Sequence, residues 1–257
     1  MKANYSYIYL AFFLLLNIFN FVDRNLLIAF APQIKSEFNL TNVQWGLLTG
    51  VYFLFFYSVF GILMGVLGDK FSRMKIAAAG VFLWSLMTAL TGVAKNFSHL
   101  IVARALIGVG ESALTPNAIS MLSDLFNQNK RGTASAIYYL GIPLGVGFGM
   151  LIAAFFGPVF GWRAVFITLG LIGMGLGIVT YFLLEPKRGQ LDVSFDEDNK
   201  SASIREIVSM TKHALYNSKC LTFAIIGSIF LHIPLGAGNF EVLCCLLYTS
   251  PSPRDRG

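Results

Sequence analysis

Long apolar runs follow one another along this chain, and they constrain its fold more than any other feature. Seven are evident: Tyr7–Phe30, Gln44–Leu67, Ile76–Ala94, His99–Leu122, Thr133–Phe156, Trp162–Leu184 and an incomplete run from Lys219 to about Leu243. About 20 residues, each rising about 1.5 Å, span the hydrocarbon core of a bilayer. The sequence therefore predicts an all-α, polytopic membrane protein.

Composition agrees with a membrane protein and argues against nucleic-acid binding. The 257 residues are 56% hydrophobic and only 12% charged, whereas soluble domains carry about 25% charged residues. The net charge is +6, but the basic residues lie in short connectors between apolar runs, as in membrane proteins. The cysteines, Cys220, Cys244 and Cys245, have no metal-ligand or disulfide spacing. We therefore expect no cofactor, no metal and no nucleic-acid partner.

The connectors on the two sides of the predicted membrane differ in their basic residues. Most Lys and Arg residues fall on one side, and only Lys35, Lys95 and Arg163 fall on the other. Because cytoplasmic loops carry the excess of positive charge, we expect the N-terminus and the long connector Glu185–Ser218 to be cytoplasmic. The expected location is the cell (inner) membrane. Within the connector, Ser203–Ala214 is a candidate amphipathic helix.

The fourth run carries Arg104 and Glu111 inside apolar sequence. A charge at mid-bilayer costs about 2.5–3.5 kcal/mol on insertion scales and is by default a sign of function. The two residues are seven apart, about two helical turns, and so share one face. Gly108 and Gly110 between them allow a neighbouring helix or a solute to come close. We predict one wall of a buried polar site; the alternative is a charge pair that only locks helices together.

The first run carries a second polar group, made up of Asn17, Asn20, Asp23, Arg24 and Asn25. Counting the helical rise places Asp23 and Arg104 within about 10 Å of the outer boundary, and Glu111 near the midplane at about the depth of Asn17. Asp23 is therefore expected to pair with Arg104 if the two helices touch. The alternative is that Asp23-Arg24 is a frayed helix end at the interface.

The connector between the second and third runs has a distinctive spacing of glycine, acid and base. It reads Gly65-Val-Leu-Gly68-Asp69-Lys70-Phe-Ser72-Arg73-Met-Lys75. We expect Gly65 to allow close packing, and Asp69 to cap a helix N-terminus or pair with a cation. Lys70 and Arg73 are expected to hold the loop at the cytosolic surface. The plainer alternative is a positive-inside loop with one acidic residue.

This connector resembles the loop signature of the major facilitator superfamily, in which it is a gating loop. Gly65, Leu67, Asp69, Lys70 and Arg73 match that signature, whereas Ser72 replaces a glycine and Met74 a position that is often basic. Three other stretches resemble family motifs of the fourth, fifth and sixth helices: Arg104 to Gly110, Gly141 to Gly149 with Pro143 and Gly145, and Gly161 to Phe166. Over about residues 15–185 the sequence looks most like the spinster-like branch.

The resemblance implies an N-terminal six-helix bundle with a 3+3 inverted repeat, followed by part of a seventh helix. We expect the bundle at residues 1–184, a cytoplasmic connector at 185–218 and the start of the seventh helix at 219–243. From Cys245 the sequence resembles a translated sequencing-library adapter, so residues 244–257 are expected to be a non-native tail. The C-terminal half would then be missing; a genuine short polar tail is the alternative.

The resemblance implies a secondary active transporter that moves a small organic solute by alternating access. Arg24 and Arg104 are candidates for binding a carboxylate or phosphate, and Asp23 and Glu111 are candidates for coupling to protons. Asn17 belongs to the same candidate site, and the small residues Gly108, Gly110, Gly141, Pro143 and Gly145 are expected to let helices bend and pack. The expected partners are the solute, protons and the lipid bilayer.

Two other classes of function are weighed against transport. The first is a half-size membrane scaffold or sensor subunit without transport activity, although no signalling module is recognisable. The second is a membrane enzyme, but the serines and His99 form no nucleophile–base constellation. We therefore expect a transporter of an anionic or amphipathic solute rather than an enzyme.

Overall fold

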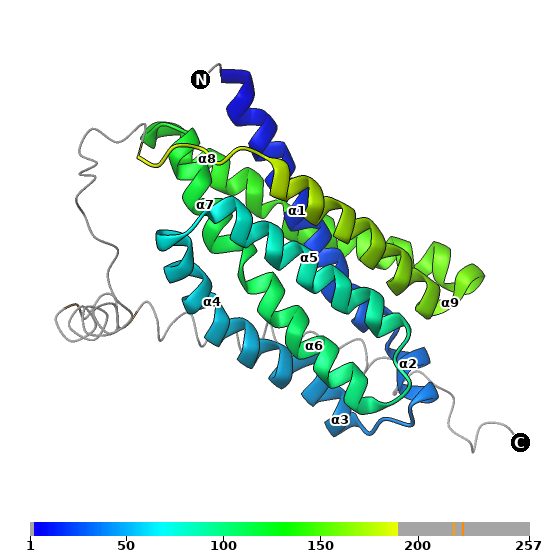
Figure 1. Cartoon of the computed structure of the whole chain (residues 1–257). Coiled ribbons are helices and arrows are strands. Elements are labelled where there is room, and N and C mark those ends of the chain that lie inside the picture. Colours follow the sequence, from blue (N-terminus) through cyan, green and yellow to red (C-terminus); the bar gives the residue numbers. More distant parts are fainter. Residues whose placement is uncertain (1–2, 190–217, 219–222, 224–257) are drawn as a thin grey trace, which may run out of the picture. The chain divides into compact units, whose positions relative to one another are not determined.

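The computed structural model describes residues 3–189, 218 and 223, and the described segments are helical without strands (Figure 1). The chain divides into two units, Met1–Ser201 and Ala202–Gly257, and the helices named next belong to the first. They are α1 (Ala3–Ala29), α2 (Ala31–Glu37), α3 (Asn42–Gly46), a π-helical turn (Leu47–Val51), α4 (Tyr52–Lys70), α5 (Arg73–Gly92), α6 (Phe97–Ser112), α7 (Leu114–Leu125), α8 (Gln128–Tyr139) and α9 (Gly141–Phe182).

Some predicted segments lie outside the described residues. These are the candidate amphipathic helix at 203–214, the seventh run at 219–243 apart from Phe223, and the tail at 244–257. The bundle predicted at 1–184 is described almost completely. The fold is therefore the all-helical, six-crossing arrangement that the sequence predicts.

The six crossings come from five continuous apolar stretches. Four of these stretches are Tyr5–Ala29, Asn42–Lys70, Arg73–Gly92 and Phe97–Leu125. The fifth, Gln128–Phe182, has 55 residues, enough for two crossings. It reverses at Gly161, whose φ of 74° and ψ of 159° leave the helical region. A residue with a Cβ is strained at such a positive φ, so glycine at this position permits the turn between the fifth and sixth crossings.

Short polar sequences begin several of these helices. The Thr41 hydroxyl accepts a hydrogen bond from the Gln44 N–H, and the Gln44 side chain accepts one from the Thr41 N–H, which forms a capping box. Ser72 and Asn96 likewise cap the first turns of α5 and α6. These caps lie where the chain turns from one crossing to the next, and the connectors between the crossings are short.

The two arms of α9 pack on different partners. A Cβ added at Gly145, in the first arm, would lie 2.5 Å from the Phe21 Cβ of α1. One added at Gly170, in the second arm, would lie 2.4 Å from the Ala89 nitrogen of α5. Glycines thus set the closest approaches of α9 to α1 and α5, which lie beside it in Figure 1.

Two glycines two residues apart on the first arm of α9 lie on different faces of the helix and give opposite expectations for alanine. In Gly145→Ala the new methyl meets Phe21 and the Ile18 carbonyl oxygen at 2.6 Å, so the free energy of unfolding should fall by about 1–3 kcal/mol. At Gly147 nothing lies within 4 Å, and alanine there should leave stability equal or higher because it favours helix. Thermal unfolding in detergent measures both; equal losses would contradict the packing described.

Candidate functional site

The charged residues of the first and fourth crossings lie inside the bundle. Asp23 and Arg24 belong to α1, which runs unbroken to Ala29, so they do not form a frayed end. Arg104 and Glu111 lie in α6. Asp23 is 4% exposed, Arg104 6% and Glu111 1%, which means that three of the four candidate residues are removed from solvent.

An ion pair joins α1 to α6. Arg24 Nε donates a hydrogen bond to Glu111 Oε2 at 2.5 Å, and the Glu111 side chain is fully buried. The predicted pairing of Asp23 with Arg104 is wrong, since Asp23 Oδ1 accepts from the Thr88 hydroxyl of α5 at 2.7 Å. Neighbouring helical residues point about 100° apart, so Asp23 faces α5 while Arg24 faces α6.

The Phe53 ring of α4 lies against both arginines of the candidate site. The guanidinium carbon is 4.9 Å from the ring centroid for Arg24 and 4.5 Å for Arg104, and Tyr57 stacks on Phe53 and also contacts Arg24. Such contacts stabilise a desolvated cation by about 2 kcal/mol. Gly108 makes this possible, because a Cβ there would lie 2.7 Å from the Phe53 carbonyl oxygen.

Sequence reasoning missed Phe53 for a simple reason. It stands in an aromatic and apolar stretch, Tyr52 to Tyr57, in which no pattern separates inward from outward residues. Only 3% of Phe53 is exposed, whereas Phe55 is 61% exposed. A packed partner helix, not the local sequence, selects which ring enters the site.

Several buried polar atoms of the site have no hydrogen-bond partner in the described structure. They are Asn20 Nδ2, Asp23 Oδ2, Arg104 Nε and Glu111 Oε1. Buried polar groups are normally satisfied, and each exception calls for an explanation. A cavity beside Arg104 has a volume of about 10 Å³, which is roughly one water molecule. The described bundle therefore supplies one polar wall with unused hydrogen-bonding capacity.

The two glycines of α6 and the residue Asn17 have separate positions. A Cβ at Gly110 would lie 2.7 Å from the Trp84 nitrogen, so Gly110 faces α5 while Gly108 faces α4. Asn17 Nδ2 donates to the Tyr138 carbonyl at 2.8 Å, where α8 gives way to α9. Asn17 thus holds the helix junction that precedes Pro143, and its described hydrogen bond goes to this junction and not to the ion pair.

Arg73 is the centre of a second buried cluster, at the end of the bundle where α5 begins. It donates to Asp124 Oδ2 at 2.5 Å, to Glu185 Oε1 at 3.0 Å and to the Ser120 hydroxyl at 2.9 Å. Only 5% of its side chain is exposed. The expectation that Arg73 holds the loop at the surface is therefore wrong, since its guanidinium binds Asp124 and Glu185 inside the protein. Lys70 is exposed.

The rest of the predicted loop differs from expectation in two details. Close packing occurs at Gly68, where a Cβ would lie 2.3 Å from Asn117 Oδ1, whereas a Cβ at Gly65 would meet nothing within 4 Å. Asp69 accepts from Arg188 through its main-chain carbonyl, and Arg188 also binds the carbonyls of Gly68 and Phe71. A basic side chain on the last carbonyls of α4 complements the helix dipole.

Glu185 links the end of α9 to this cluster and should respond to acid. Burial raises the pKa of its carboxyl, but hydrogen bonds from Ser72 and Arg73 lower it by more, so the net pKa lies below the usual range. Its stabilisation is then complete above the unfolded-state pKa of about 4.3 and is lost as pH falls through the folded-state pKa. We expect Glu185→Gln to lower the unfolding temperature at neutral pH; a difference that persists at about pH 3 would contradict this.

At the opposite end, the Gly161-Trp162-Arg163 stretch ties the start of the sixth crossing to its neighbours. Arg163 donates to Glu37 Oε1 at 2.6 Å and to the carbonyls of Gly92 and Ala94 at 2.9 and 2.8 Å. The Trp162 indole N–H donates to Glu37 Oε2 at 2.8 Å. Hydrogen bonds from Arg163 hold the pKa of the Glu37 carboxyl below its usual range. These contacts close the bundle at the end of α5.

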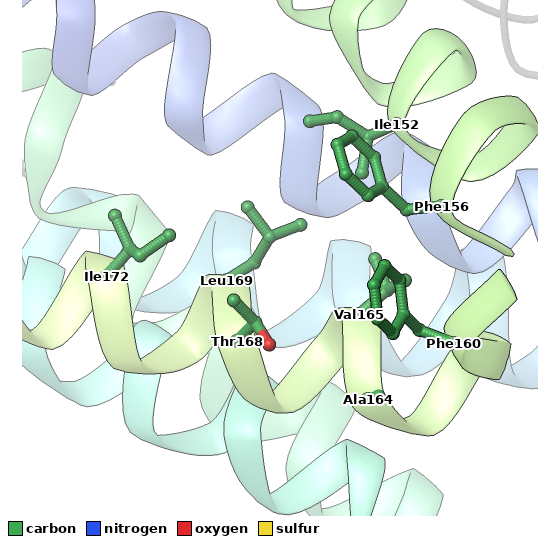
Figure 2. A pocket seen from close by; sticks show the side chains of 8 residues that line it. All are labelled: Ile152, Phe156, Phe160, Ala164, Val165, Thr168, Leu169 and Ile172. Carbon is green, nitrogen blue, oxygen red and sulfur yellow. The ribbon is translucent and has the colours of Figure 1, made fainter.

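An apolar groove of about 350 Å³ lies between the two arms of α9 (Figure 2), and none of its lining residues is charged. Phe156 and Phe160 come from the first arm, and Leu169 and Ile172 from the second. Thr168 is the one polar residue among the eight that line it. With so little polarity the groove lacks the groups that would orient a charged solute, so the candidate site is the Arg24–Glu111 cluster.

Comparison with known proteins agrees with this architecture. The sequence model of the family described as Major Facilitator Superfamily matches residues 13–243. The sphingosine-1-phosphate transporter SPNS2 of Danio rerio is 33% identical over 180 residues, which cover 68% of this chain and 36% of that protein. The probable L-galactonate transporter of Escherichia coli (strain K12) is 31% identical over 166 residues, covering 65% and 36%.

A solved structure has the same fold. It is a bacterial homologue of the human lysosomal transporter Spinster in an inward-facing and occupied conformation, with a TM-score of 0.65 and 30% identity. The match covers 75% of this chain and 47% of that one. The chain thus spans about a third of the length of the curated relatives it matches and about half of the solved one.

Proposed function

Because the chain belongs to the Major Facilitator Superfamily and resembles its spinster-like members, we propose that it forms the N-terminal part of a proton-coupled secondary transporter. The transported solute is a small organic anion or an anionic amphipath, and it moves by alternating access. The observation that carries this proposal is the buried Arg24–Glu111 ion pair beside Arg104. Buried charges in a membrane bundle are expensive and mark solute or ion pathways.

Arg104 is the stronger candidate for binding the solute. Among the described residues Arg104 Nε has no hydrogen-bond partner, and the guanidinium lies over the Phe53 ring, whereas Arg24 is paired with Glu111. A guanidinium offers a planar fork of donors that matches a carboxylate or a phosphate. A solute oxyanion that reaches Arg104 would satisfy donors that the described bundle leaves unused.

Glu111 and Asp23 are the candidates for the coupled proton. Protonation of Glu111 would remove the negative charge that holds Arg24, and Arg24 would then be released toward a solute anion. Loss of the proton would restore the pair and expel the anion. One Asp23 oxygen accepts from Thr88, and the other has no hydrogen-bond partner within residues 3–189, so Asp23 is able to accept a proton beside the pair.

The class of solute follows from chemistry that two relatives share. One is named for sphingosine-1-phosphate and the other for L-galactonate. The first is an amphipathic phosphate and the second a carboxylate, and both are oxyanions suited to arginine. We place the N-terminus and the Arg73 cluster in the cytoplasm, in a cell membrane, because basic residues concentrate at that end. The relatives' remaining length would supply the opposite wall of the site.

Proteoliposomes that contain the complete gene product test this proposal. They are loaded with the pH-sensitive dye pyranine, and radiolabelled L-galactonate or sphingosine 1-phosphate is added outside. Solute entry accompanied by a change of internal pH is expected, with acidification for symport and alkalinisation for antiport. Entry without a pH change would contradict proton coupling, and failure of both anions to enter would contradict the proposed solute class.

A further inference from the structure

A second groove runs along the bundle surface near the N-terminal end of α5. Its volume is about 250 Å³. Ala78, Ala79 and Phe82 of α5 line one side, and Gly177, Ile178 and Tyr181 of α9 line the other. The helices are close here because Gly177 packs on Phe82, where an added Cβ would lie 2.9 Å from the Phe82 nitrogen. The walls are apolar and belong to membrane-crossing segments, so hydrocarbon is the natural filling.

The groove ends at a cation, Lys75, in the first turn of α5. Lys75 is exposed, and its Nζ lies 5.9 Å from the centroid of the Tyr181 ring. Among the described residues no ion pair joins a carboxylate to Lys75, and Glu185 binds Arg73 and Arg188. A lysine and a tyrosine at the end of a membrane crossing lie at the depth of lipid headgroups.

We propose that this groove binds an anionic phospholipid of the leaflet that meets the α5 N-terminus. One acyl chain lies between α5 and α9 along Ala79 and Ile178, and the Lys75 ammonium binds the phosphate. Charge complementarity selects the headgroup, because no carboxylate of residues 3–189 pairs with the Lys75 ammonium and lysine is a common phosphate ligand. The apolar groove of Figure 2 has no charged residue in its lining and should not select a headgroup.

Native mass spectrometry of the full chain in detergent tests the proposal with phosphatidylglycerol and phosphatidylcholine of identical acyl chains. The wild type should retain phosphatidylglycerol preferentially, and Lys75→Gln should reduce that preference by about fivefold, the value expected for one basic residue at a lipid surface. Lys70→Gln is the matched control, since Lys70 is an exposed base in the same loop outside the groove. It should leave the preference unchanged.

A third variant tests the acyl-chain part of the site. Ala79 is exposed and lines the groove, so Ala79→Trp should fill it and lower retention of both lipids without touching Lys75. The proposal is overturned if the wild type shows no preference, if Lys75→Gln keeps it, or if Lys70→Gln loses as much, because the attraction would then belong to the surface as a whole. Monodisperse elution of each variant establishes that it is folded.

Discussion

Glu111→Gln is expected to abolish solute accumulation driven by a proton gradient while leaving solute-for-solute exchange partly intact. The glutamine amide keeps the size of the side chain and an oxygen that can accept from Arg24 Nε. The glutamine side chain is neutral and does not take up or release a proton. Protonation therefore cannot break and re-form its contact with Arg24, and the proton gradient no longer drives the cycle. Accumulation with a pH gradient should fall to the level measured without one, whereas counterflow of labelled solute should continue.

Glu37→Gln is the matched control for this variant. Glu37 also pairs with an arginine, Arg163, but its side chain is 43% exposed and lies at the end of the bundle where α5 ends. Its removal should leave the pH dependence of uptake unchanged. Wild-type pH dependence in Glu111→Gln would contradict the assignment of Glu111 to proton coupling.

Arg73→Ala is expected to lower the free energy of unfolding by about 3–5 kcal/mol. The substitution would remove the guanidinium that now binds the carboxylates of Asp124 and Glu185 inside the protein. Removal of one member of a buried ion pair is strongly destabilising, and this accounts for most of the expected loss.

Lys70→Ala separates this effect from the general loss of a loop cation. Lys70 lies three residues earlier and is exposed, so its removal should change stability by less than about 0.5 kcal/mol. Thermal or denaturant unfolding in detergent measures both variants. Equal, small losses for Arg73→Ala and Lys70→Ala would show that the Arg73 cluster does not stabilise the bundle.

The crossings were predictable from the sequence because the length of an apolar run is a local property. The run Ile76–Ala94, for example, corresponds to α5 at Arg73–Gly92. The helix ends differ by a few residues, since caps such as Ser72 lie outside the apolar run. The positions of buried charges were predictable for the same reason, because Arg104 and Glu111 stand out against apolar neighbours.

Partners within the site were not predictable from the sequence. Asp23 and Arg24 are adjacent, so a depth count gives them almost the same height but does not say which faces α6. The count of helical rise placed Asp23 at the depth of Arg104. The packing of α1 instead turns Arg24 toward α6, where it pairs with Glu111. Phe53 could not be distinguished from Phe55 without knowing which helix lies beside it.

The loop at the α5 end shows the same limit. The spacing of glycine, acid and base indicated a defined structure, but the buried role of Arg73 depends on Asp124 and Glu185, which are 51 and 112 residues away. No local pattern connects residues so far apart. The motif likewise did not show which of its glycines is closely packed. It is Gly68, because Asn117 of α7 lies against it.

The central claim is that the Arg24–Glu111 pair acts in transport and does not merely lock α1 to α6. Uptake by the variant Arg24→Met/Glu111→Leu tests it most directly, because hydrophobic residues of similar volume often replace a structural buried ion pair without loss of stability. We predict that this variant folds, elutes as the wild type does and fails to accumulate L-galactonate or sphingosine 1-phosphate under a pH gradient. Wild-type accumulation of either anion by the double variant would contradict the claim and leave the pair a helix lock.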